Sequence, residues 1–131
     1  MKKRGILQNE LAQVIATLGH MDALVIADAG LPVPAGVQRI DLAVIGGIPK
    51  FVEVLCAVLD DVKVERAVIA RETRETSPAL YREMTALLGS TSIEEVSHAE
   101  LKDKTRHARA VVRTGEFTPY ANIILLSGVV F

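Results

Sequence analysis

The residues best placed to do chemistry are polar side chains that directly follow short apolar runs. Asp28 follows the run 23–27, and the turn 113–116 closes a run that begins at Ala110. In open α/β sheets, ligands gather at the carboxyl ends of the strands. If both runs are strands of one sheet, we expect a small polar site close to Asp28 and to this turn.

Two histidines lie at opposite kinds of helix terminus. His20 comes just after a predicted helix, where the negative end of the helix dipole supports a protonated imidazole. His98 lies in the first turn of another predicted helix, where the positive end of the dipole tends to keep the ring neutral. On local electrostatics His20 is therefore the better proton donor, and a neutral His98 can donate or accept a hydrogen bond.

Each of these features also has a purely structural interpretation. Asp28 could simply cap the turn at Ala29-Gly30, as Asp before Gly usually does. A lone histidine is more often a surface residue than a catalyst, and residues 118–120 could form an ordinary loop with a half-buried phenol. The mixed charges of residues 71–75 are typical of a solvated face.

The motifs of several common cofactor and metal chemistries are absent. There is no GxGxxG, GxxxxGK[ST], HExxH or GxSxG. His98-Ala99-Glu100 has the spacing found in zinc deaminases, but Cys56 is the only cysteine and cannot complete that site. A metal shared by His20, His98 and Asp28 would need closure from distant segments of the chain. We expect no metal and no cofactor, which leaves acid–base work by His, Asp and Tyr, or plain binding of a polyhydroxyl ligand.

Hydrophobic periodicity predicts strands that alternate with helices along the chain. The predicted helices cover residues 9–18 (capped by Asn9 and stopped by Gly19), 50–60, 77–89 (capped by Ser77, with Leu87 on the apolar face) and a short stretch from Ser97. The predicted strands are 23–27, 64–70, 93–96, 110–113, 123–126 and, more weakly, 38–42. This alternation predicts one α/β domain over residues 1–131, with a sheet that is largely parallel at its centre and helices covering its faces.

The composition argues against nucleic-acid and membrane partners. The 131 residues carry 15 basic and 16 acidic side chains, without the basic surplus that binds phosphate backbones. No apolar run approaches the roughly 18 residues of a membrane helix, and no signal peptide is recognisable, so we expect a cytoplasmic protein. Half of the residues are hydrophobic but only 4% are aromatic, and this aliphatic excess suits buried strands or an oligomer. Cys56 excludes an intramolecular disulfide, and its apolar helical setting predicts a core position.

Three blocks of sequence occur in order along the chain. They are Leu18-Gly19-His20, residues 27–34 (ADAGLPVP) and residues 113–122 (RTGEFTPYAN). Together they resemble the D-ribose pyranase family, sugar mutarotases that interconvert pyranose and furanose ribose, with fucose mutarotases as a sister branch. Gly30 and Ala121 match the ribose branch, whereas the fucose branch carries His and Gly there. The resemblance runs over the whole chain and is loose between Arg71 and Glu95.

The resemblance implies roles for the residues left open above. His20 matches the proton donor of the family. The positions that match its sugar-binding residues are Asp28, His98, Tyr120, Ala121 and Asn122. Members of the family are ring-shaped homo-oligomers, decamers of two pentameric rings with sites between neighbouring subunits, which implies the same assembly and D-ribose as the ligand.

The implied reaction needs one proton donor and one acceptor. Opening a pyranose removes a proton from the anomeric hydroxyl and gives one to the ring oxygen, and closing a furanose repeats this through another hydroxyl. We expect protonated His20 to be the donor and Asp28 to orient the sugar or to tune His20, while the base stays open. Two alternatives also stay open: a ribose-binding accessory protein of an importer, without catalysis, and a mutarotase for another sugar such as fucose.

Overall fold

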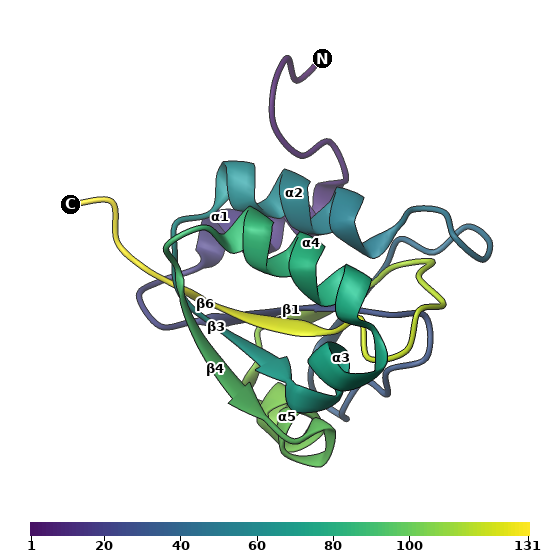
Figure 1. Ribbon diagram of the computed structural model, residues 1–131. Coiled ribbons are helices and arrows are strands. Elements are labelled where there is room, and N and C mark those ends of the chain that lie inside the picture. The colour runs from purple at the N-terminus through teal and green to yellow at the C-terminus, as the bar shows by residue number, and fades with distance from the viewer.

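The computed structural model describes residues 1–131 as a six-stranded sheet with helices on both faces (Figure 1). The elements in chain order are α1 (Asn9–Thr17), β1 (Ala23–Ala27), β2 (Gln38–Asp41), α2 (Phe51–Asp61), β3 (Val64–Ala70), α3 (Arg71–Thr76), α4 (Pro78–Leu88), β4 (Ser92–Val96), α5 (His98–Lys104), the 3-10 turn Thr105–His107, β5 (Ala110–Arg113) and β6 (Ile123–Ser127). None of the helices combines the length and the apolar character needed to cross a membrane. The predicted α/β domain is thus observed.

The sheet is mixed, which corrects the prediction of a parallel centre. The strand order is β2-β5-β1-β6-β3-β4, and β6 runs antiparallel to both of its neighbours, β1 and β3. The other neighbouring pairs are parallel. A parallel connection needs a crossover of a dozen or more residues, usually a helix. Residues 114–122 contain no helix between β5 and β6, so the chain re-enters the sheet from the edge at which it left.

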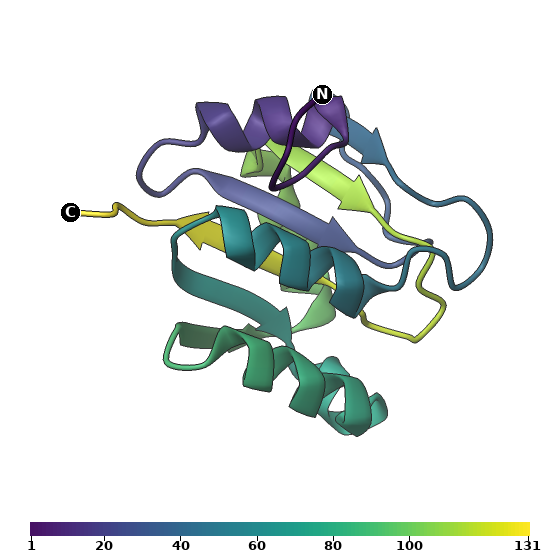
Figure 2. The same cartoon turned by 90° about the horizontal axis from the view of Figure 1, so that it is seen from above.

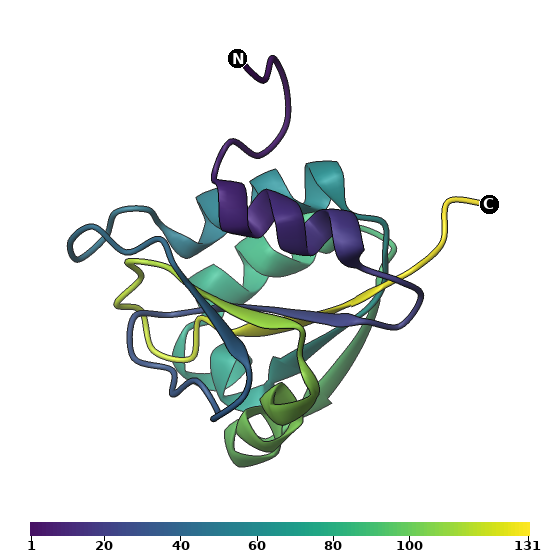
Figure 3. The ribbon, with the colours of Figure 1, turned by 180° about the vertical axis from the view of Figure 1, so that it is seen from behind.

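The two faces of the sheet carry separate hydrophobic clusters, because successive side chains of a strand point to opposite faces. Leu24 and Ile26 of β1 pack with buried residues of α1, α2 and α4. Val25 and Ala27 face the other side, where Leu31 and Leu101 of α5 cover them. Figure 2 shows the three longer helices lying across one face, and Figure 3 shows α5 on the opposite one.

Strand predictions are closer to the structure than predictions of helix ends. The predicted ranges 23–27 and 64–70 are confirmed as β1 and β3. Gln8 rather than Asn9 caps α1, since the N–H of Leu11 donates to Gln8 Oε1 at 2.6 Å. Leu18 is the C-terminal cap, so Gly19 lies at the C′ position expected for it. Ser77 precedes α4 but does not cap it with its side chain.

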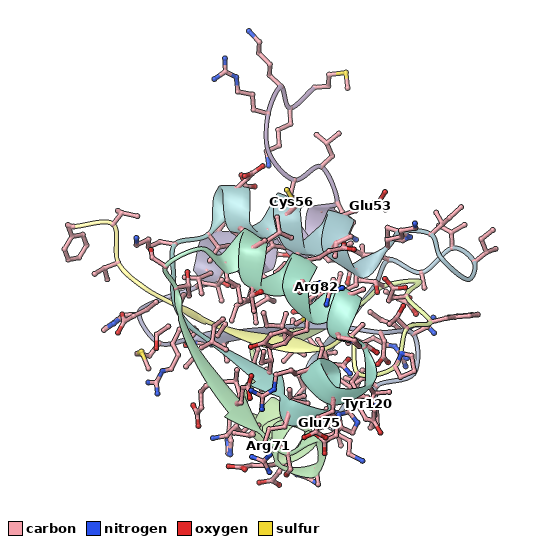
Figure 4. The ribbon with its side chains drawn as sticks, in the orientation of Figure 1. Glu53, Cys56, Arg71, Glu75, Arg82 and Tyr120 are labelled. Atoms are coloured by element: carbon pink, nitrogen blue, oxygen red, sulfur yellow. The ribbon has the colours of Figure 1, made fainter.

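The core position expected for Cys56 is wrong. The buried stripe of α2 includes Phe51, Leu55 and Val58, and Cys56 lies about 100° further round the helix than Leu55. Its thiol is exposed on the side of α2 away from the sheet (Figure 4). Leu87 is 38% exposed on α4. Apolar residues continue around both predicted helices beyond the buried face. The sequence therefore did not show which of them face the sheet and which face solvent.

Candidate functional site

One edge of the sheet collects the polar residues that border its strands. Five strands run in the same direction and end at this edge, and β6 begins there. The polar residues next to these strand ends are Asp28 after β1, Glu72 and Thr73 after β3, His98 after β4, Thr114 after β5 and Asn122 before β6. In Figure 1 the loops that carry Asp28 and Asn122 lie on the right. The expected gathering of polar residues at the strand ends is therefore observed.

Asp28 and Asn122 are joined by two hydrogen bonds although 94 positions separate them in the sequence. The backbone N–H of Asp28 donates to Asn122 Oδ1 at 3.0 Å, and Asn122 Nδ2 donates to Asp28 Oδ2 at 2.9 Å. Asp28 Oδ1 accepts from the N–H of Gly30 at 2.9 Å, so Asp28 also caps its turn. Because Asn122 is fully buried, its amide fixes the carboxylate at the end of β1.

His98 begins α5, and its backbone holds it in place. Its N–H donates to Glu72 Oε2 at 2.9 Å, and Ser97 caps the helix by accepting from the N–H of Glu100. The ring packs edge-on against Tyr120, with 5.0 Å between the ring centroids and 75° between the planes. The predicted His98 position, in the first turn of a short helix, is confirmed.

The surroundings of His98 favour its neutral form. Burial, followed by the positive charge of Lys102, lowers the pKa of His98, while the carboxylates of Asp28 and Glu72 act in the opposite direction. Its Nδ1 is buried and has no hydrogen-bond partner within the chain. A neutral imidazole can donate or accept a hydrogen bond. This direction agrees with the neutral ring expected from the sequence, with burial rather than the helix dipole as the first cause.

Tyr120 is held in an unusual backbone conformation beside this ring. Its φ of 61° lies in the left-handed region, which a tyrosine adopts only under constraint. Its carbonyl accepts from Thr73 Oγ1 at 2.8 Å and from the N–H of Asn122 at 2.9 Å. The side chain of Ala121 is buried in the core on the α1, α2 and α4 face, so this residue can offer only its backbone to a ligand.

One shallow pocket includes Asp28, and a second lies beside α5. One has a volume of about 460 Å³ and is lined by Asp28, Ala29, Gly30, Glu116, Phe117, Thr118 and Pro119. The other, of about 450 Å³, lies between the prolines of the loop after β1 and Lys102 on α5. Carboxylate, amide, imidazole and phenol groups at this edge are the donors and acceptors that sugar hydroxyls require.

The turn 113–116 holds the loop that carries Asp28 through contacts of Arg113 and Thr114. The Arg113 guanidinium pairs with Asp41 at 2.6 Å and reaches the carbonyl of Ala29 at 3.4 Å. Thr114 Oγ1 donates to the carbonyl of Ala27 at 2.8 Å. These contacts tie the end of β5 to the loop that follows β1.

His20 lies at the opposite edge of the sheet. It stands in the turn before β1, whereas Asp28 follows that strand, and the five residues of β1 alone span about 17 Å. Its Nε2 is 2.7 Å from Glu65 Oε2 on β3, and the two side chains are 53% and 51% exposed. Within one chain the structure therefore brings together Asp28, His98, Tyr120 and Asn122, but not His20.

Sequence reasoning missed three residues of this edge. Glu72 and Thr73 lie in the charged run expected to be solvated, yet Thr73 is fully buried and Glu72 holds the backbone of His98. Arg71 and Glu75 of that run are exposed, and Figure 4 labels both, with Tyr120, in the lower part of the view. Lys102 could have been found, because it follows His98 by four residues and i, i+4 side chains share one face of a helix.

Comparison with known proteins identifies the family. Residues 1–130 match the RbsD / FucU transport protein family, to which the chain therefore belongs. Two curated relatives, from Coprothermobacter proteolyticus and Laribacter hongkongensis, are 53% and 54% identical to it over 131 residues, which is 100% of both chains in each case. Both carry the name D-ribose pyranase.

Solved structures agree with this assignment. Bacillus subtilis RbsD complexed with D-ribose is 46% identical over 100% of both chains, with a TM-score of 0.98. The fucose mutarotase of Streptococcus pneumoniae in complex with L-fucose is 25% identical over 93% of both chains, with a TM-score of 0.77. The likeness to the ribose-bound structure is thus the stronger of these two.

Proposed function

We propose that this protein is a D-ribose pyranase, an isomerase that interconverts the pyranose and furanose forms of D-ribose. The observation that carries the proposal is full-length identity of about half to proteins of that name. The fold agrees, because it matches a ribose-bound RbsD with a TM-score of 0.98. The polar cluster at the carboxyl edge supplies the groups that a small polyhydroxyl ligand needs.

In the proposed binding mode, Asp28, His98, Tyr120 and Asn122 hold the sugar. Asn122 Nδ2 donates to Asp28 Oδ2 and the N–H of Gly30 donates to Oδ1, and the remaining lone pairs of the two oxygens accept from sugar hydroxyls. Neutral His98 contributes its free ring nitrogens, and the Tyr120 phenol both donates and accepts. Ala121 takes part through its backbone.

The proposed reaction opens one ring and closes another. His20 gives a proton to the ring oxygen while the bond from that oxygen to the anomeric carbon breaks and the electron pair goes to the oxygen. The anomeric O–H loses its proton to a base, and its electrons form the carbonyl. A different hydroxyl then adds to the same carbon and loses its proton, and the carbonyl oxygen gains one. Donation by a positioned acid contributes about 10²–10⁴-fold to such a reaction.

We further propose that His20 reaches the sugar from a neighbouring subunit. The separation of His20 from the other residues along β1 supports this arrangement, as does the half-exposed position of its side chain. A decamer of two pentameric rings remains our expectation for the assembly, and native mass spectrometry should then give the mass of ten chains. A cytoplasmic location also stays a prediction, which fractionation of expressing cells would test.

The deciding experiment follows the anomeric protons of ribose by NMR exchange at equilibrium. We expect the wild-type protein to accelerate pyranose–furanose exchange and His20→Ala to lose about 10²–10⁴-fold of that acceleration while still binding ribose. His107→Ala is the matched control, since His107 is an exposed histidine on the 3-10 turn. Binding of ribose without any acceleration by the wild type would instead favour a non-catalytic accessory protein. Faster exchange of fucose than of ribose would favour the fucose alternative.

A further inference from the structure

The His20 edge of the sheet contains a second feature that the proposed reaction has not used, the carboxylate of Glu65. His20 Nε2 lies 2.7 Å from Glu65 Oε2, although 45 positions separate them in the sequence. The sheet order places β6 between the strand that follows His20 and the strand that carries Glu65. The pair therefore bridges across the end of β6.

The turn that carries His20 is firmly attached to that strand end. The N–H of Met21 donates to the carbonyl of Ser127 at 2.8 Å, and the N–H of Ser127 donates to the carbonyl of Asp22 at 2.9 Å. The Ser127 hydroxyl also donates to the carbonyls of Gly19 and Asp22. The backbone on both sides of His20 is thus fixed, and Glu65 is the side chain that orients the imidazole.

The chemistry of this contact decides which ring nitrogen is free. An ionised carboxylate only accepts hydrogen bonds, so Nε2 must carry a hydrogen in the pair. Nδ1 is then the nitrogen that gains or loses a proton. We propose that Glu65 is a positioning residue that holds His20 through Nε2, so that Nδ1 exchanges the proton with the sugar; this rests on the proposed role of His20.

The proton balance favours this arrangement. In the opening step, the Nδ1–H of the imidazolium gives its proton to the ring oxygen, and the neutral ring keeps its Nε2–H on Glu65. In the closing step, neutral Nδ1 takes the proton of the hydroxyl that adds to the anomeric carbon. One nitrogen works in both directions only if the other stays protonated throughout. Carboxylates that bind the second nitrogen of a working imidazole have this effect on its tautomer.

The first test compares Glu65→Ala and Glu65→Gln with the wild type in the NMR exchange assay. We expect Glu65→Ala to slow exchange at saturating ribose by about 10- to 100-fold, the loss seen when the carboxylate partner of a metal-bound imidazole is removed, with little change in ribose affinity. Glu65→Gln keeps an acceptor oxygen and should retain more activity than Glu65→Ala. The matched control is Glu94→Gln, a similarly exposed carboxylate on β4 that lies 3.8 Å from Arg66.

The second test reads the imidazole directly, by ¹⁵N NMR of labelled protein with the His20 signals assigned from His20→Ala. We expect neutral His20 to be the Nε2–H tautomer in the wild type and a mixture of tautomers in Glu65→Ala. An Nδ1–H tautomer in the wild type, or full exchange activity in Glu65→Ala while His20→Ala is inactive, overturns the role of Glu65 alone. Full activity in His20→Ala overturns the role of His20 and with it that of Glu65.

Discussion

The two edges of the sheet differ in how they hold their polar residues. At the carboxyl edge, buried Asn122 and Thr73 fix Asp28 and Tyr120 through hydrogen bonds from within the protein. At the other edge, His20 is half-exposed and its side chain meets one partner, Glu65. Side chains that are locked in place suit their proposed role in recognising one sugar shape. A half-exposed His20 suits its proposed role as an acid that acts on a sugar held by a neighbouring chain.

The strongest way to break this comparison is to mix two inactive variants. His20→Ala lacks the proposed acid, and His98→Ala lacks a proposed binding residue. If each site takes its two halves from neighbouring subunits, refolding an equal mixture should restore about a quarter of the wild-type sites, because both intact halves meet by chance at that frequency. NMR exchange on the mixture measures it. A mixture as inactive as its components would place both halves of the site in one chain.

The next largest effect is expected from Asn122→Ala. It leaves the partly buried N–H and carboxylate of Asp28 without their partner, and a hydrogen bond to a charged group contributes about 1.5–3 kcal/mol. We therefore expect a loss of that size in the free energy of unfolding together with weaker ribose binding, measured by denaturant titration and calorimetry. Asn9→Ala is the control, because Asn9 is exposed and its side chain bonds only the next residue's N–H. Equal stability of the two variants would show that the hydrogen bonds of Asn122 do not hold Asp28 at the carboxyl edge.

A smaller effect should appear in the pH dependence of stability through His98. Burial and Lys102 lower the pKa of His98, so the unfolded chain binds this proton more readily than the folded one. The contribution to stability is therefore complete above the unfolded value of about 6.5 and falls as the pH drops below it. His98→Gln should lack this component, and the difference in unfolding free energy between the two proteins should change between pH 7 and pH 5. A constant difference across that range would show that His98 titrates normally.

The smallest effect is expected at the His20 edge, from Arg109→Ala. Arg109 pairs with Asp22 at 3.1 Å, but its side chain is 59% exposed, and such pairs contribute about 0–1 kcal/mol. The N–H of Gly19 and, next, Arg109 lower the pKa of Asp22, so this contribution is present above pH 3.8 and is lost as the pH falls further. Thermal unfolding at neutral and acid pH measures it. A loss as large as that of Asn122→Ala would remove the contrast between the edges.

Local patterns predicted the strands well, because short runs rich in β-branched residues favour strands over helices. Residues 23–27 and 64–70 are runs of this kind, and turn residues follow the first of them. The direction of β6 was not predictable in the same way, since its apolar sequence fits a parallel or an antiparallel neighbour equally well. The nine-residue connection 114–122 decides the direction of β6, because it is too short for the crossover that a parallel strand needs and contains no helix.

The site was predictable as residue types and less so as contacts. Asp28 and the turn 113–116 followed from strand ends, whereas the partners of Asp28 and Tyr120 lie 94 and 47 positions away and depend on sheet order. The inward-facing positions of Glu72 and Thr73 were not predicted from the charged run 71–75. A helix as short as α3 has too few residues to show a hydrophobic periodicity. The separation of His20 from Asp28 does follow from the sequence, since a strand lies between them.

The position of β6 also affects the order in which the protein can become functional during synthesis. The last strand of the chain fills the middle of the sheet, between β1 and β3. Until it emerges from the ribosome, β2-β5-β1 and β3-β4 are two separate ribbons, and Asp28 has no Asn122 to bind. Such long-range pairing is slow to form, because loop closure precedes the contacts that stabilise it. The nascent chain therefore completes the Asp28–Asn122 edge of the sheet only once β6 has joined β1 and β3.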